Sequence, residues 1–213
     1  MARPLTGGAS TLERTVVTRH DDEEDSRKSS FEDERGVATA VGSVVHRMME
    51  NLDFDEDLAA QLGEGLNRES ADLELDFDGK TLAVARERLS ALVDLMASGV
   101  CLDFLASVAP GVMGREIAIV APPHEDGGPI GAVTGFVDLV YRDPEDGRVV
   151  VADYKTDSVE DDAALEERTC IYEPQVRTYA RALREALTLD YEPHVELWFL
   201  AADRIVRLQS DEG

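Results

Sequence analysis

The chain has little lysine, little cysteine and no long hydrophobic stretch. Its 213 residues include 45 acidic and 21 basic side chains, a formal net charge of −24. The lysines among these bases are Lys28, Lys80 and Lys155. No apolar run approaches the roughly 20 residues that a bilayer span needs, so we expect no membrane contact. The sequence also has no internal repeat, which excludes collagen, coiled coils and solenoids.

The two cysteines, Cys101 and Cys170, can form at most one disulfide bridge. Neither belongs to a C-x-x-C pair, so nothing indicates a zinc site, a redox pair or an iron–sulfur cluster. We therefore expect reduced, structural thiols. The first residues have no apolar stretch of signal-peptide length, and a cytoplasmic location is expected.

The acidic balance has a consequence for partners. A surface of this charge repels phosphate backbones, which argues against a nucleic-acid partner because duplex affinity comes largely from cations. In other respects the composition is ordinary, with 43% hydrophobic and 31% charged residues. Such a chain is long enough to bury a core of its own.

Three regions follow one another along the chain. Residues 1–34 are polar and charged, and they predict a disordered acidic tail or linker. Residues 35–110 are predicted to be helical, because apolar residues recur at three- and four-residue steps. Pro110-Gly111 ends this pattern. Residues 111–213 have the strand period and are expected to form one domain together with 35–110.

The second half predicts an α/β fold with a mixed sheet. Three segments predict a β-meander: 116–121, 132–141 and 148–154. The last two are joined by the turn sequence Asp143-Pro144-Glu145-Asp146-Gly147. Residues 172–187 predict an amphipathic helix, and 194–200 and 205–208 a further strand pair. The order of helices, three strands, a helix and two strands is typical of the α/β class.

Two of the predicted strands carry residues that could bind a metal or take part in a reaction. Asp138 lies in one strand, and Asp153-Tyr154-Lys155 end the next. Residues two apart on a strand share a face, so Asp153 and Lys155 point the same way and Tyr154 points to the other side. Hairpin pairing brings Asp138 near them. Two carboxylates beside an apolar strand need a cation, and their oxygens suit Mg²⁺ or Mn²⁺. The sequence therefore predicts a divalent metal site.

Lys155 adds a reaction to this site. An ammonium beside metal-bound carboxylates can orient an attacking water or stabilise charge on a phosphoryl oxygen, as in metal-assisted phosphodiester hydrolysis. The alternative is a surface ion pair between Asp153 and Lys155 at a strand end, which is common and contributes little. The sequence leaves both interpretations open.

Four segments in order resemble the PD-(D/E)XK nuclease domain that ends RecB- and AddA-type (UvrD-like) helicase–nucleases. They are Gly42-Ser43-Val44-Val45-His46, residues 135–141, residues 151–157 and residues 172–180. The resemblance covers about residues 36 to 209. It implies a restriction-endonuclease-like core, with a mixed sheet flanked by helices and preceded by a helical N-terminal region.

The resemblance also implies roles for single residues. His46, Asp138 and Asp153 correspond to metal ligands, and the carbonyl of Tyr154 to a further ligand. Lys155 corresponds to the catalytic base or electrostatic stabiliser. For His46 the alternative is an ordinary packed or exposed helical histidine.

Three further catalytic residues are implied in the same way. Gln175 and Tyr179 match the family's Q-x-x-x-Y motif. Four-residue spacing on a helix makes both face the same way, and the resemblance implies that this is toward the scissile phosphate or the DNA strand. Glu116 matches an acidic residue on the first core strand that touches the metal or its water. Alternatives are a core role for Tyr179 and an ordinary strand-entrance acid for Glu116.

The function implied is a Mg²⁺-dependent DNA exonuclease that acts on single-stranded ends in double-strand-break repair. Its partner would be a helicase domain or subunit of a RecBCD- or AddAB-like complex. The acidic surface is compatible with this if a helicase delivers the DNA, if arginines 177, 181 and 184 line a strand path, or if the host is salt-rich. The alternatives are a catalytically inactive nuclease-like module that binds DNA or a helicase, and an acidic nucleic-acid mimic.

Overall fold

A computed structural model describes residues 7–8, 25–77, 79–121 and 133–209 of the chain. Its elements follow the predicted order, with helices first, then three strands, a helix and two strands. A two-residue strand, β1 (Gly7–Gly8), precedes them and pairs in parallel with the start of β3. The rest of the predicted tail up to residue 24 lies outside the described residues.

The predicted helical region consists of four helices and one short 3₁₀ turn, η2 (Ala109–Gly111). The helices are α1 (Asp25–Glu50), α2 (Leu58–Asp76), α3 (Gly79–Ala97) and α4 (Val100–Val108). The start of α1 differs from the sequence-based boundary, since residues 25–34 are helical and not a disordered tail. Once an apolar face has nucleated a helix, adding polar residues at its end requires no new nucleus.

The sheet is mixed and has six strands in the order β1-β3-β4-β5-β6, with β2 also paired to β3. An antiparallel meander is formed by β2 (Val112–Ala121), β3 (Val133–Arg142) and β4 (Val149–Lys155). Helix α5 (Asp162–Leu187) then leads to β5 (His194–Phe199), which runs parallel to β4. Strand β6 (Arg204–Arg207) closes the edge in antiparallel pairing. The α/β prediction with a mixed sheet is confirmed.

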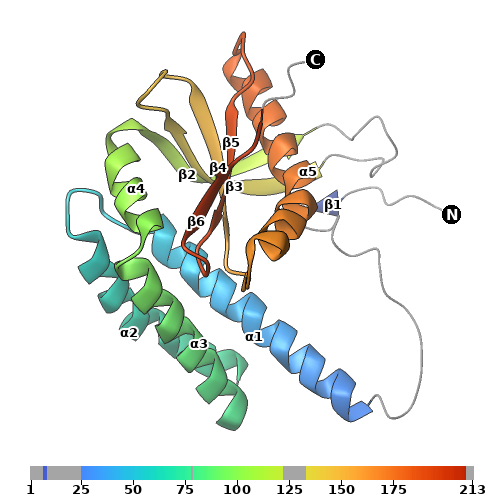
Figure 1. Cartoon of the computed structure of the whole chain (residues 1–213). Coiled ribbons are helices and arrows are strands. Elements are labelled where there is room, and N and C mark those ends of the chain that lie inside the picture. Colours follow the sequence, from blue (N-terminus) through green and yellow to red (C-terminus); the bar gives the residue numbers. More distant parts are fainter. Residues whose placement is uncertain (1–6, 9–24, 78, 122–132, 210–213) are drawn as a thin grey trace, which may run out of the picture.

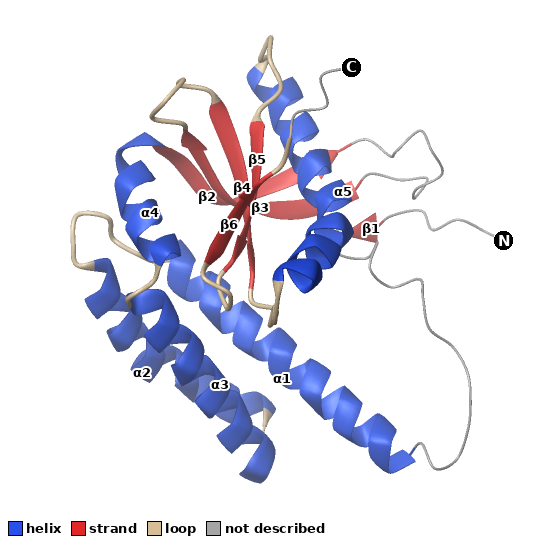
Figure 2. Ribbon diagram, viewed as in Figure 1, coloured by secondary structure: helices blue, strands red, loops and turns tan. Residues whose placement is uncertain are grey.

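Helices cover both faces of the sheet. Helices α1 to α4 lie on one face and α5 lies on the other (Figures 1 and 2). We call the buried residues between α1–α4 and the sheet the helical-layer cluster. It includes Val41, Val45, Met49, Leu62, Leu89, Leu105, Leu139, Tyr141, Val150, Ala152, Tyr154, Trp198 and Leu200.

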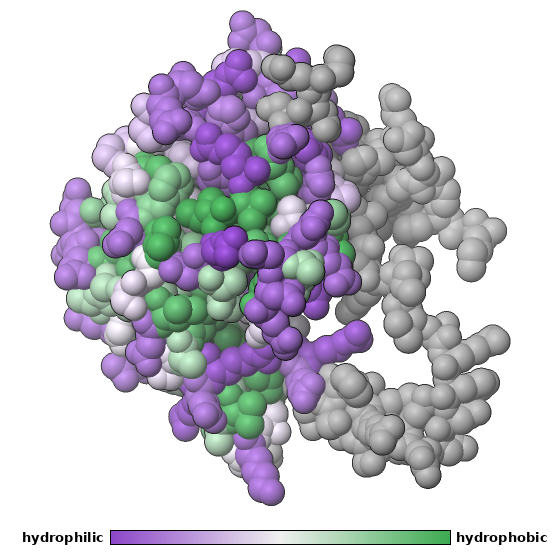
Figure 3. Space-filling model, in the orientation of Figure 1, coloured by the Kyte–Doolittle hydropathy of each residue, from purple (hydrophilic) through white to green (hydrophobic). Residues whose placement is uncertain are grey.

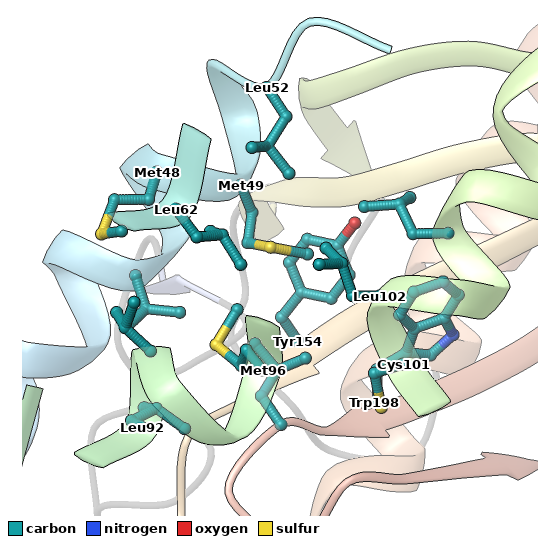
Figure 4. Close-up of a cluster of buried hydrophobic side chains, with 14 of the residues drawn as sticks. Met48, Met49, Leu52, Leu62, Leu92, Met96, Cys101, Leu102, Tyr154 and Trp198 are labelled. Atoms are coloured by element: carbon teal, nitrogen blue, oxygen red, sulfur yellow. The ribbon is translucent and has the colours of Figure 1, made fainter. Parts of the chain in front are cut away.

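The α5 cluster fills the opposite face of the sheet. It includes Val137, Val140, Val149, Val151, Tyr172, Val176, Tyr179, Leu183, Leu197 and Phe199. In the helical-layer cluster, Tyr154 and Trp198 of the sheet lie among methionine and leucine side chains of the helices (Figure 4). Burying one such side chain contributes about 2 kcal/mol, so the helices and the sheet stabilise one another.

Strand β4 alternates between the two clusters. Ala152 and Tyr154 belong to the helical-layer cluster, whereas Val151 belongs to the α5 cluster. Asp153 and Lys155 therefore face α5, and their side chains form an ion pair there. The sequence-based expectation that these two share a face opposite Tyr154 is confirmed.

Helix α5 begins at Asp162, ten residues earlier than the sequence pattern predicts. The helix passes through Pro174. Asp161 caps its start by accepting a hydrogen bond from Ala164 N. The burial of Leu165 and Tyr172 further favours the longer helix.

Both cysteines are free thiols, with Cys101 buried and Cys170 exposed. No single helix in the described ranges is long and apolar enough to cross a bilayer. Only α3 and α4–η2 taken together, bent by 56°, reach that length and composition. Figure 3 shows apolar patches toward the centre of the viewed face, with hydrophilic side chains around them.

Candidate metal centre

The site lies where β3 and β4 separate. Their pairing extends from Arg142 and Val149 to Leu139 and Ala152, one residue short of the two aspartates. Beyond that point the Asp138 side chain replaces the backbone as hydrogen-bond acceptor, and its Oδ2 accepts from the Tyr154 backbone N–H at 2.5 Å. A carboxylate thus bridges the fork between the strands, and it is 5% exposed.

Glu116 lies opposite Asp138 on β2, since the flanking pairs are in register. Its φ of 47° is in the left-handed region, which costs a non-glycine residue about 1–3 kcal/mol. The alternation of β3 also breaks here, because Val137 belongs to the α5 cluster and Leu139 to the helical-layer cluster. A left-handed residue and a break in side-chain alternation therefore coincide at the site, as is common where a fold positions functional groups.

Helix α1 contributes His46 to the same point. Its Nδ1 lies 3.0 Å from Asp138 Oδ1 and 3.7 Å from Glu116 Oε1. One potential ligand atom from each of these three residues lies within 4.8 Å of the other two. The structure therefore brings together two of the predicted ligands, His46 and Asp138, and adds Glu116 to them.

Gly42 explains how α1 approaches so closely. A Cβ atom at this position would lie 3.1 Å from Thr156 Oγ1, just after β4. A larger residue would require the Thr156 side chain or the helix to shift by a few tenths of an ångström. His46 follows one helical turn later on the same side of α1.

Asp153 approaches the fork from the α5 side. Its Oδ2 is buried and accepts no hydrogen bond of good geometry from the described residues, although Lys155 Nζ is 2.9 Å away. It is not one of the three residues whose ligand atoms lie within 4.8 Å of one another. Its charge nevertheless acts on the cluster by raising the pKa of both Asp138 and His46.

The pKa shifts of Asp138 and His46 reflect an excess of negative over positive charge at the site. Burial, and then the charge of Asp153, raise the pKa of Asp138 above its ordinary value. Burial would lower the pKa of His46, but hydrogen bonds to Asp138 and Glu116 and the nearby charges outweigh it and raise the pKa to about 10. Carboxylate oxygens and an imidazole nitrogen are suitable donors for a divalent cation, so the residues present fit such an ion.

A hydrogen-bonded chain from α5 reaches the lysine. Lys155 Nζ donates to Gln175 Oε1 at 3.1 Å, and Gln175 Nε2 donates to the Tyr179 hydroxyl at 2.8 Å. Both residues of the Q-x-x-x-Y motif therefore face the site side of the sheet. The Tyr154 ring packs in the helical-layer cluster, and the metal-binding role of its carbonyl stays a prediction.

Two residues beside Lys155 have no role assigned by the sequence. They are Tyr172, whose ring lies under the ammonium, and Asp157, which accepts a hydrogen bond from Tyr172. The signal available was their presence in the segments that carry the family resemblance. Periodicity alone cannot predict that Lys155 on a strand and Tyr172 on a helix, seventeen positions later, are in contact.

A second acidic group lies at the far end of β4. Asp143, Asp146 and His194 also have ligand atoms within 4.8 Å of one another. Here, however, positive charge is already supplied. It comes from Arg207, which is 2.6 Å from Asp143. His194 Nε2 lies 2.8 Å from Asp146 Oδ2, so the members of this group are already engaged with one another and with Arg207.

The three arginines of α5 line a separate cavity of about 1130 Å³ on the helix's outer side. Arg177 donates to Glu173 and to the Gln209 carbonyl, and Arg184 pairs with Glu192. None of the metal-centre residues described above lines this cavity. A strand path along these arginines to the site remains a prediction.

The fold and the site together define a class. A mixed sheet between helices, with acids at the fork of two strands and a lysine two residues after one of them, is the arrangement of a metal-dependent nuclease. The family model of the PD-(D/E)XK nuclease superfamily matches residues 19–211, and the chain belongs to this superfamily. Comparison with curated proteins finds none that matches the chain.

Proposed function

We propose that the protein is a Mg²⁺-dependent deoxyribonuclease that hydrolyses phosphodiester bonds. The observation that carries the proposal is the position of Asp138 at the fork of β3 and β4. It lies between His46 and Glu116 on one side and the Asp153–Lys155 pair on the other. Superfamily membership supplies the reaction class, and this juxtaposition supplies the groups that the reaction needs.

The residues divide into a metal-holding set and a lysine-centred set. His46, Glu116, Asp138 and Asp153 would hold Mg²⁺, or Mn²⁺ in its place. Such an ion polarises a phosphoryl oxygen and lowers the pKa of a bound water. Lys155, fixed by Asp153 and Gln175, would orient the attacking water and stabilise negative charge on the phosphoryl group.

The finer proposal is an exonuclease of the RecB/AddA type. What supports it is the placement of the four resembling segments, each on a separate element around one site. His46 lies on α1, Asp138 on β3, Asp153 and Lys155 on β4, and Gln175 on α5. In this proposal the substrate is a single-stranded DNA end during double-strand-break repair in the cytoplasm.

A helicase partner is part of the same proposal. A net charge of −24 gives the chain little electrostatic attraction for a phosphate backbone. Tethering to a helicase that delivers the strand would replace intrinsic affinity by a high local concentration. This partner would be a helicase domain or subunit.

The test is cleavage of end-labelled DNA by the full chain. Linear single-stranded, linear duplex and circular single-stranded DNA are compared with Mg²⁺, Mn²⁺ or EDTA. We expect cleavage of linear single strands with either metal and none with EDTA. Cleavage of the circle would replace exonuclease by endonuclease.

A catalytically inactive module gives a different result. It would cleave none of these substrates, and Mg²⁺ would not raise its unfolding temperature. An ion bound at about a hundred times its dissociation constant stabilises the native state by about 2.7 kcal/mol, which a thermal shift detects. Absence of both cleavage and shift would remove the proposed enzyme.

A further inference from the structure

The ammonium of Lys155 is held on three sides. Asp153 Oδ2 lies 2.9 Å away, Gln175 Oε1 lies 3.1 Å away, and the centroid of the Tyr172 ring lies 3.9 Å away. The side chain of Lys155 is only 14% exposed. Asp153 belongs to the same strand and Gln175 to the Q-x-x-x-Y motif. Neither the strand pattern nor that motif accounts for the third contact, which is with Tyr172.

Tyr172 is itself fixed in place. Its hydroxyl donates to Asp157 Oδ2 at 2.6 Å, and its ring packs near that of Phe199 with centroids 6.4 Å apart. It is 6% exposed. Asp157 follows β4 by two residues, so this hydrogen bond joins α5 to the chain segment directly after Lys155.

We propose that Tyr172 is a positioning residue for Lys155, and that Asp157 acts through Tyr172. The inference rests on the proposed nuclease function. The ring face attracts the ammonium, and a phenol that donates to a carboxylate is richer in electrons and attracts it more strongly. Lysine has many rotamers, so a third contact selects the one in which the ammonium faces the fork of β3 and β4.

This role predicts which kinetic constant changes. Tyr172 contacts Lys155 and Asp157 and none of the metal-holding residues His46, Glu116, Asp138 and Asp153 in the interactions given above, so metal affinity and substrate KM stay near wild type when its ring is lost. The lysine then samples other rotamers, and kcat falls. Misplacing a catalytic group by about 1 Å can cost up to about a hundredfold in rate.

The experiment measures kcat, KM and the Mg²⁺-induced thermal shift on labelled single-stranded DNA. We expect Tyr172→Leu to lower kcat by about tenfold or more, with KM and thermal shift within about twofold of wild type. Tyr172→Phe keeps the ring and is expected to lose less. Asp157→Asn should match Tyr172→Phe, and the double variant should lose no more than either single one because the two act as a unit.

Tyr191→Leu is the matched control. Tyr191 also lies under a cation, with Arg148 5.4 Å from its ring centroid, but it contacts Val149 at the opposite end of β4. We expect its kcat to equal wild type. A kcat for Tyr172→Leu equal to that of Tyr191→Leu would overturn the proposal, as would a loss confined to KM. Should Tyr172→Leu fail to fold, Tyr172→Phe and Asp157→Asn decide the question by the same criteria.

Lys155→Ala separates this inference from the proposed function. If Lys155→Ala cleaves normally, the role of the lysine fails and the inference fails with it. If Lys155→Ala is inactive while Tyr172→Leu is fully active, only the positioning role of Tyr172 is wrong.

Discussion

Lys155 differs from Lys80 in its surroundings. Lys80 is exposed near the start of α3, whereas the Lys155 ammonium is largely buried against a carboxylate, an amide oxygen and a ring. A buried ammonium needs such partners to offset the loss of water. The ion pair considered for Asp153 and Lys155 is present, but it does not lie at the surface, because both side chains are at most 14% exposed.

Two substitutions separate metal binding from turnover. Asp153→Ala should abolish Mg²⁺-dependent cleavage and weaken the Mg²⁺-induced thermal shift, since it removes an oxygen that would hold the ion. Lys155→Ala should keep the thermal shift and lose turnover by about a hundredfold or more. Cleavage of labelled DNA and thermal unfolding with and without Mg²⁺ measure both effects.

Lys80→Ala is the control for these substitutions and should behave like wild type. Normal cleavage by the Asp153 or the Lys155 variant would remove that residue from the mechanism.

Gly135 provides a steric test at the same site. A Cβ atom there would lie 2.6 Å from the Tyr179 hydroxyl oxygen and 2.9 Å from its ring. Gly135→Ala must therefore displace Tyr179 and the Gln175–Lys155 contact that follows. We expect a loss of about 1–3 kcal/mol in the free energy of unfolding, together with reduced cleavage.

Gly63→Ala in α2 is the matched glycine control. No described atom lies within 4 Å of its Cβ position, so alanine should stabilise the helix by up to about 1 kcal/mol. Chemical denaturation measures both variants. A Gly135→Ala protein as stable as the Gly63→Ala protein would contradict the steric argument.

Among single residues, the sequence predicts what strand alternation and helix periodicity control. The shared face of Asp153 and Lys155 follows from the first, and the common facing of Gln175 and Tyr179 follows from the second. The left-handed conformation of Glu116 follows from neither. The close approach at Gly42 likewise depends on where a distant strand ends.

At the element scale, α4 is capped from far along the chain. Its N-cap residue, Gly99, has no side chain to accept hydrogen bonds. Asp203 in the turn between β5 and β6 accepts instead, from Val100 N at 2.7 Å and from Cys101 N at 2.9 Å. A Cβ atom at Gly99 would lie 2.5 Å from Asp203 Oδ1, so the helix start needs glycine there.

This cap predicts a dependence of stability on pH. Partial burial raises the pKa of Asp203, but hydrogen bonds from Cys101 and Val100 N–H outweigh it and hold the pKa below its ordinary value. The stabilisation is therefore present above about pH 4, the unfolded value, and fades as the pH falls through the lower folded value.

Asp203→Asn removes the charge and one of the two acceptor oxygens, while asparagine tolerates the residue's φ of 51°. We expect wild type to be more stable by about 1 kcal/mol near neutral pH. This difference should shrink below about pH 4. Denaturant titrations across this range measure it, and a difference that stays constant at all pH values would contradict the charged cap.

Element existence was easier to predict than element ends. The order of helices and strands follows from apolar periods that survive in the structure. The starts of α1 and α5 could not be predicted from these periods. In α1, polar residues before the apolar stripe are helical. In α5, the helix continues through Pro174. A cap such as Asp161 is visible in the sequence only after the helix that it starts is known.

At the scale of the whole molecule, negative charge opposes the compact state. A net charge of −24 repels itself, and salt screens it over a Debye length that falls from about 10 Å at 0.1 M to about 3 Å at 1 M. We expect the unfolding temperature to rise when KCl is raised over this range. Thermal unfolding monitored by circular dichroism measures the change.

Cleavage activity recorded in the same KCl series addresses the origin of the acidity. Activity that persists at molar salt would favour adaptation to a salt-rich host. Loss of both activity and stability would count against this explanation and leave delivery of DNA by a helicase.

The whole-molecule architecture was predictable because both core clusters draw on strongly patterned segments. The helical-layer cluster joins residues of α1 to α4 with residues of β3, β4 and β5, so the helical region and the sheet share one core. The contact of Trp198 in β5 with Phe104 in α4, which belongs to this shared core, could not be derived from periods within single segments.

The bond between Val100 and Asp203 spans 103 residues of the chain. During synthesis from the N-terminus, α4 leaves the ribosome long before the hairpin that completes its first turn. Until then the backbone amides of Val100 and Cys101 lack the carboxylate that accepts their hydrogen bonds in the folded protein. The first turn of α4 is thus completed only after residue 203 has been synthesised, and a ribosome stalled before that residue would display an unfinished helix to chaperones.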